Sequence, residues 1–192
     1  MRADARRNYE RLVEIARDAF AERGTEASLE DIAKAAGVGI GTLYRHFPTR
    51  QALLREVLRE GVLAIQARGE ELLLAATSPE EALAEWLRAL ACHTAAFRGL
   101  AGEIMDGLRD EGSELSEACG VMEATTAEVL ARAQGSGVVD PDVTAEDLIK
   151  LVSALAWLTE QGEEGAERLF GIMFSGLLRS GATYAGAVPS SG

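Results

Sequence analysis

The 192-residue chain has few cysteines, histidines and aromatic residues: it contains two cysteines and two histidines, and 5% of its residues are aromatic. Cys92 and Cys119 lie in segments with helical spacing, and one such pair does not make a disulfide framework. We therefore expect both thiols to be reduced and buried in a cytoplasmic protein. The two histidines lie far apart and the cysteines are separated, so no metal-ligand set forms and no metal or other cofactor is expected.

Long apolar runs and the common enzyme motifs are also missing. No run approaches the roughly 18 apolar residues that cross a bilayer, and the N-terminal MRADARRNYERL is charged, so neither a membrane span nor a signal peptide is expected. The chain has no nucleophile elbow, phosphate loop or metalloprotease helix, which predicts that it is not an enzyme. The glycines of 37–41 resemble a dinucleotide-binding loop, but a helix precedes them where that loop needs a strand.

Alternation of apolar and polar residues is almost absent, whereas apolar spacings of three and four recur from end to end. This pattern predicts an all-α protein. Gly24 ends the first helix, Ser28 caps the second, and residues 135–142 form the clearest loop. About nine helices are expected, over approximately 6–23, 28–37, 40–46, 50–69, 79–97, 102–110, 113–133, 144–159 and 163–180.

The net charge of −12, with a pI of about 4.7, argues by itself against binding to nucleic acid. The acidic residues are unevenly distributed, because residues 1–68 carry a net charge of +2 and residues 69–192 carry −14. No acidic residue lies between Asp31 and Glu56. The basic residues in that interval are Lys34, Arg45, Arg50 and Arg55. The charge distribution favours binding of nucleic acid by the N-terminal end alone.

Two short helices joined at a glycine, after a longer helix, are the parts of a helix-turn-helix. In the third helix, Ile40, Leu43 and Phe47 have the spacing of residues that pack against the first two helices. The side chains left pointing elsewhere are Thr42, Tyr44, Arg45 and His46. Such side chains suit a helix in the major groove, where Arg can bind guanine and hydroxyl groups can reach phosphates.

The run from Phe20 to Leu58 carries a specific set of apolar, turn and polar positions. Its elements are Ala19-Phe20 with Gly24, the turn Ala36-Gly37-Val38, the segment from Gly41 to Phe47, and Arg50 just inside the fourth helix. In these features the run resembles the DNA-binding domain of the TetR family of bacterial transcriptional regulators. The resemblance covers about a third of the chain.

The resemblance implies a TetR-type helix-turn-helix DNA-binding domain at 5–65, with the helix-turn-helix at about 28–47, an effector-binding and dimerisation domain at 66–185, and a flexible tail at 186–192. The protein would be a repressor that binds a pseudo-palindromic operator in double-stranded DNA as a homodimer. The implied DNA-binding residues are Ser28, Lys34, Ile40, Gly41, Thr42, Tyr44, Arg45, His46 and Arg50. Among them, Arg45 and Ile40 would set sequence preference, and Arg50 would clamp the DNA backbone.

A small, mostly apolar effector is expected in the C-terminal domain. His93 shares one helical face with apolar residues, which suits either a core face that tolerates a histidine or a pocket with one polar group. The resemblance supports a pocket without fixing its residues. The candidate lining residues are Trp86, Leu90, His93, Phe97, Met105 and Met122.

The last two helices are apolar nearly all round, so each must bury more than one face. A four-helix bundle formed by two helices from each chain would do this, and the resemblance implies dimerisation of this kind. A buried central helix in a monomer is the alternative. The candidate interface residues are Leu151, Leu155, Leu158, Phe170, Met173 and Leu177.

Two other functions remain open from the residues alone. The N-terminal three-helix unit could bind another protein, which would make the chain an interaction or structural protein. A small-molecule enzyme is the other alternative, although no catalytic motif supports it.

Overall fold

The computed structural model describes residues 2–109, 112–161 and 165–178, and these form nine helices and no strand. The bounds are α1 (Arg2–Arg23), α2 (Leu29–Ala35), α3 (Ile40–His46), α4 (Arg50–Leu74), α5 (Pro79–Ala95), α6 (Leu100–Arg109), α7 (Ser116–Gly135), α8 (Ala145–Glu160) and α9 (Ala166–Leu177). The all-α prediction is confirmed. No helix in the described ranges is long and apolar enough to cross a membrane.

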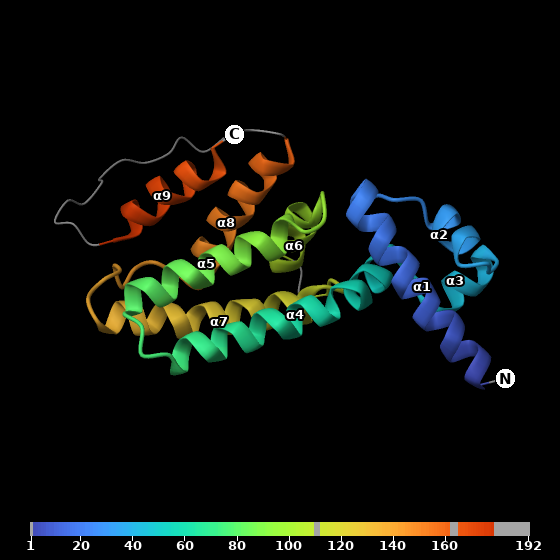
Figure 1. Cartoon of the computed structure of the whole chain (residues 1–192), viewed down its shortest axis with the longest axis horizontal. Coiled ribbons are helices and arrows are strands. Elements are labelled where there is room, and N and C mark those ends of the chain that lie inside the picture. Colours follow the sequence, from blue (N-terminus) through green and yellow to red (C-terminus); the bar gives the residue numbers. More distant parts are fainter. Residues whose placement is uncertain (1, 110–111, 162–164, 179–192) are drawn as a thin grey trace.

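The first three helices form a unit at one end of the molecule, next to the beginning of α4 (Figure 1). Its core contains Leu12, Phe20, Ile32, Leu43 and Leu53, all fully buried. Local hydrogen bonds set the helix starts, since a side-chain oxygen that accepts from an amide of the first turn stabilises a helix N-terminus. Ser28 does this for α2 and Thr49 for α4.

The remaining helices form a larger body into which α4 extends (Figure 1). Helix α4 packs along α7, and α5 packs against α8, with α9 against α8. Trp86 lies at the centre, fully buried, and its Nε1 donates to the Thr126 hydroxyl at 3.1 Å. That bond satisfies the one polar atom of a side chain that otherwise contributes only apolar area to the core.

Helix α4 is longer than predicted, because Gly69 does not end it. A Cβ at Gly69 would lie 2.2 Å from Thr125 Cγ2 and 3.2 Å from the Trp86 ring. The glycine is therefore required for close packing between helices, and α4 continues to Leu74. The predicted domain boundary near residue 65 falls inside this continuous helix, so α4 is part of both the N-terminal unit and the larger body.

Three other predictions differ from the structure in detail. Helix α1 begins at Arg2, before the predicted start, and α7 begins at Ser116, after it. The prediction that both cysteines are buried is wrong for Cys92, which is exposed, whereas Cys119 is buried and burial raises the pKa of its thiol to about 11. The predicted tail at 186–192 lies outside the described residues.

Candidate DNA interface and effector site

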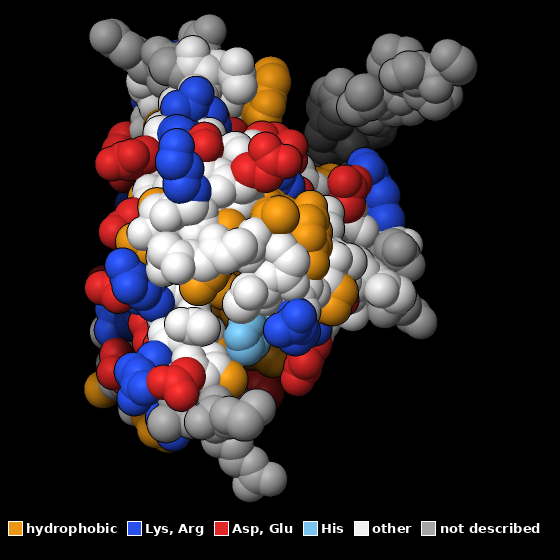
Figure 2. Space-filling view, turned by 90° about the vertical axis from the view of Figure 1, so that its right-hand side faces the viewer, with side chains coloured by type: hydrophobic (Ala, Val, Ile, Leu, Met, Phe, Trp, Pro, Cys, Tyr) orange, Lys and Arg blue, Asp and Glu red, His pale blue; other side chains and the backbone are white. Residues whose placement is uncertain are grey.

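Helix α3 follows the predicted spacing at most positions. Leu43 and Phe47 are buried and Tyr44 is 48% exposed, as predicted. The prediction that Ile40 packs against the first two helices is wrong, because Ile40 is 37% exposed at the open start of α3. Arg45 is also exposed. Figure 2 looks onto this end of the molecule, where uncharged and hydrophobic side chains occupy the middle of the face and charged ones lie mostly toward its edges.

The turn before α3 and its first residues are open. A Cβ added at Gly39 or Gly41 would meet no other atom within 4 Å. A surface without side chains lets another molecule come close to the backbone. Lys34, at the end of α2, is exposed as well. Thr42 is half-buried, and Ser28 is half-buried with its hydroxyl used for capping α2.

His46, at the end of α3, packs against α1. Its ring meets the ring of Tyr9 edge to face at 5.9 Å, and Tyr9 lies 5.0 Å from the Phe47 ring. Sequence reasoning missed Tyr9. The signal was present, because Tyr9 precedes Leu12 by three positions and Ala16 by seven, on the face that α1 buries.

The Arg50 guanidinium has a role inside the protein that the sequence did not predict. Its Nη1 donates to the carbonyl oxygen of Thr25 at 2.8 Å and to that of Ala27 at 2.6 Å. The first residue of α4 thereby holds the turn between α1 and α2, next to Ser28. The Nη2 and Nε donors of Arg50 are not used in these two bonds.

The same turn contacts the larger body. Thr25 N donates to the Arg98 carbonyl oxygen at 2.8 Å, and Gly99 N donates to Glu160 Oε2 at 3.0 Å. Gly99 has a φ of +87°, and a Cβ there would lie 2.5 Å from Thr25 Oγ1. The α1–α2 turn, the α5–α6 turn and the end of α8 therefore form one hydrogen-bonded junction between the two parts of the molecule.

The structure separates the predicted effector-pocket residues. Trp86 and Leu90 are fully buried within the packed core and line none of the described pockets. His93 and Met122 do share one, with Cys119 among its other lining residues, but its volume is about 10 Å³. Phe97 and Met105 are half-buried and line none of the described pockets. Burial lowers the pKa of His93, which favours a neutral imidazole.

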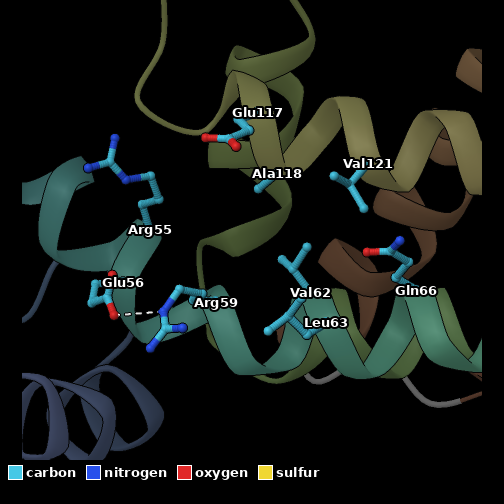
Figure 3. Close-up of a pocket in the computed structure, with 9 residues that line it drawn as sticks. All are labelled: Arg55, Glu56, Arg59, Val62, Leu63, Gln66, Glu117, Ala118 and Val121. Carbon is cyan, nitrogen blue, oxygen red and sulfur yellow. Dashed lines mark hydrogen bonds and ion pairs between the residues drawn. The ribbon is translucent and has the colours of Figure 1, made fainter.

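A larger groove, of about 230 Å³, lies between α4 and α7 (Figure 3). It shares Val62 and Ala118 with the small cavity beside His93. Sequence reasoning missed it because its charged residues lie on the polar side of α4. The lining residues are Arg55, Glu56, Arg59, Val62, Leu63, Gln66, Glu117, Ala118 and Val121.

The predicted interface residues of α8 and α9 differ in how far they are buried. Phe170 is only 5% exposed, under the Arg88 guanidinium at 4.8 Å from the ring centre. Leu155, Leu158, Met173 and Leu177 are half-buried, and Leu151 is 41% exposed. Trp157 and Ile172, which were not predicted, are more exposed, at 52% and 58%.

Helix α2, the turn at Gly37 and the exposed helix α3 form a helix-turn-helix, and the other described elements are also helices. These features define the class of helix-turn-helix proteins. Family models agree with this class: residues 12–57 match the bacterial regulatory proteins of the tetR family, and residues 78–179 match the C-terminal domain of SbtR-like transcriptional regulators. The chain belongs to the TetR family of transcriptional regulators.

Solved structures and curated relatives support the assignment. A TetR transcription regulatory protein from Mycobacterium vanbaalenii is 36% identical, with 93% of this chain and 99% of that one covered and a TM-score of 0.52. A TetR regulator from Streptomyces coelicolor is 29% identical over 88% of this chain and 98% of that one, with a TM-score of 0.57. The transcriptional repressor KstR2 of Mycolicibacterium smegmatis is 40% identical over 73 residues, 38% of this chain and 36% of that protein. The chain thus matches about a third of the length of these curated relatives.

Proposed function

We propose that the protein is a homodimeric repressor that binds a pseudo-palindromic operator in double-stranded DNA and responds to a small, mostly apolar effector. The observation that carries the DNA-binding part is the exposed face of α3, with Tyr44 and Arg45 on it, in a stretch without acidic residues. The repressor part is supported by the KstR2 relative, which matches over 73 residues and is named a transcriptional repressor.

In this proposal residues 5–65 bind DNA and residues 66–185 bind effector and partner. Arg45 and Ile40 read base edges, because a guanidinium can bind guanine at two atoms and an apolar side chain can contact a thymine methyl group. Contacts to phosphates hold the unit in register without reading sequence. The residues proposed for those contacts are Ser28, Lys34, Gly41, Thr42, Tyr44, His46 and Arg50.

The dimer is proposed to form through the outer faces of α8 and α9. Trp157, Ile172 and Leu151 are large apolar side chains exposed on these two helices. Exposed apolar side chains that gather on neighbouring elements mark interaction sites. A two-fold dimer would present two α3 helices to two half-sites of an operator.

Selection of bound sequences from a random pool of double-stranded DNA tests the DNA-binding part. We expect enrichment of a pseudo-palindromic site, and we expect Arg45→Ala to change the preferred bases within each half-site. Arg68→Ala is the control, because Arg68 is an exposed arginine of α4 that pairs with Glu71 and Glu85 in the larger body. No enrichment would contradict DNA binding, and identical sites for the Arg45 variant would contradict base reading.

Sedimentation equilibrium tests the dimer. The wild-type chain should have twice the monomer mass, and Trp157→Glu with Ile172→Glu should shift it toward the monomer. Leu74→Glu is the matched control, because Leu74 is an exposed apolar residue at the end of α4, 88% exposed. A monomer mass at all concentrations for the wild-type chain would refute the dimer.

A further inference from the structure

The groove between α4 and α7 has a charged end and an apolar middle. Arg55 and Arg59 lie one helical turn apart at the charged end, whereas Val62 and Leu63 line the next turn of α4. Ala118 and Val121 face these residues from α7, as Figure 3 shows. A site that is charged at one end and apolar in the middle fits a ligand that has a hydrocarbon part and a charged group at one end.

Both arginines are paired with carboxylates that a ligand could replace. Arg55 Nη1 donates to Glu114 at 2.5 Å, and the two side chains are 47% and 36% exposed. Arg59 Nε donates to Glu56 Oε1 at 2.8 Å. The Arg55–Glu114 pair is exposed and contributes little to stability, so exchanging its carboxylate for another costs little. In the Arg59–Glu56 pair the arginine is exposed and the glutamate is 19% exposed. Each guanidinium has five donors, which allows bidentate binding of a carboxylate.

Two carboxylates, Glu56 and Glu117, also line the groove. Glu56 is already engaged by Arg59, and it lines a pocket with Tyr9, where burial and the charge of Glu56 raise the pKa of the Tyr9 hydroxyl. Glu117 faces the charged end from α7 (Figure 3) and would repel a group with two negative charges. A ligand with one negative charge meets less repulsion from Glu117 than a ligand with two.

The geometry points to a small amphipathic monocarboxylate as the occupant of this groove, with its carboxylate on Arg55 and Arg59 and its hydrocarbon part on Val62, Leu63, Ala118 and Val121. This inference rests on the proposed function, for which it names the class of effector. The groove volume of about 230 Å³ lies just under the roughly 300–1,000 Å³ typical of sites for drug-sized ligands. A compound of about ten non-hydrogen atoms is therefore a suitable probe.

The charged end of the groove is connected to the recognition helix. Glu56 and Arg59 line both this groove and a pocket between α1 and α4 to which Tyr9 contributes. Tyr9 shares that pocket with Glu56, and its ring touches the ring of His46 in α3. If a ligand carboxylate replaces Glu56 as the partner of Arg59, the Glu56 carboxylate beside Tyr9 loses its cation, which changes the surroundings of the tyrosine that packs against α3. Tyr9 is thus a positioning residue.

Isothermal titration calorimetry of the full chain with octanoate, 1-octanol and octylammonium tests the ligand class. Octanoate should bind at least about tenfold more tightly than the other two, and Arg55→Gln or Arg59→Gln should weaken it by about tenfold. Arg68→Gln, on the same helix but away from the groove, should leave the affinity unchanged. Glu117→Gln should tighten binding, because it removes a like charge.

Equal affinity for the three compounds, no binding of octanoate, or the same loss in Arg68→Gln would overturn the inference. This measurement contains no DNA, so its result is independent of the proposed function. If the wild-type chain binds no DNA from a random pool, the proposed function fails, while calorimetry still decides the ligand class.

The connection to α3 is tested by fluorescence anisotropy with a DNA site selected from the pool. Saturating octanoate should change the wild-type affinity for that site by about fivefold or more. Tyr9→Phe should keep the octanoate affinity and lose most of this change, because it keeps the ring and removes the hydroxyl. Arg17→Gln is the control, since it removes another contact between α1 and α4, the 2.8 Å pair with Glu60. A full response in Tyr9→Phe would overturn the connection.

Discussion

Replacing Arg50 by alanine should lower both the stability of the protein and its affinity for DNA. The substitution removes two hydrogen bonds from a charged donor to the carbonyl oxygens of Thr25 and Ala27. Both of those residues are buried, at 2% and 4% exposure. A hydrogen bond to a charged group contributes about 1.5–3 kcal/mol, and Arg50 is only half-buried, so the expected loss in the free energy of unfolding is about 2–4 kcal/mol.

Urea unfolding followed by circular dichroism measures this loss, with Arg68→Ala as the control. That variant loses only exposed ion pairs and should change the free energy of unfolding by less than about 1 kcal/mol. If the two variants unfold at the same urea concentration, the internal role of Arg50 is refuted.

The DNA contact proposed for Arg50 has a separate signature. Each phosphate contact contributes about 0.9 to the slope of the logarithm of the binding constant against the logarithm of salt concentration. Arg50→Ala should therefore reduce the slope by about 0.9 per subunit and weaken binding to specific and random DNA alike. A weaker affinity with an unchanged slope would mean that Arg50 acts only by holding the α1–α2 turn.

Two further predictions concern the junction and the small cavity. Gly99→Ala should lower the melting temperature, because it combines a φ of +87° with a Cβ 2.5 Å from Thr25 Oγ1, whereas the control Gly102→Ala, in α6 with no atom within 4 Å of its Cβ, should raise it slightly. A melting temperature for Gly99→Ala at or above that of the wild-type chain would contradict the close approach. Burial lowers the pKa of His93 below its ordinary 6.5, so the unfolded chain takes up the proton first and the free energy of unfolding should fall as pH drops below about 6.5. Unfolding in urea between pH 5 and 8 measures this, and an identical pH dependence in His93→Gln would exclude His93 as its source.

The helices and the orientation of α3 could be predicted because both depend on local patterns. Apolar spacing of three and four places Leu43 and Phe47 inside and leaves Tyr44 outside. The same spacing wrongly places Ile40 inside, because the described residues leave the start of α3 uncovered. Capping residues act within one turn, so Ser28 marks the start of α2 in the sequence as it does in the structure. The predicted end of α4 at Gly69 is wrong, because a glycine that ends a helix and a glycine that permits close packing look alike in the sequence.

The effector site could not be predicted in the same way. Apolar and polarisable side chains suit a pocket and a packed core equally well, and Trp86 and Leu90 are fully buried in the core. The groove lies where α4 and α7 pack side by side, which the sequence does not specify. In the sequence, its charged residues look the same as those of any solvated helix face.

The sequence by itself determined the helices, the exposed face of α3 and the separation of charge, because each follows from neighbours within a few residues. Only the tertiary structure decided which polar groups meet. Arg50 meets Ala27 across 23 positions, and Arg55 meets Glu114 across 59. Such pairs depend on how helices cross, and the crossing is fixed by the packing of apolar side chains, not by the polar residues that it brings together.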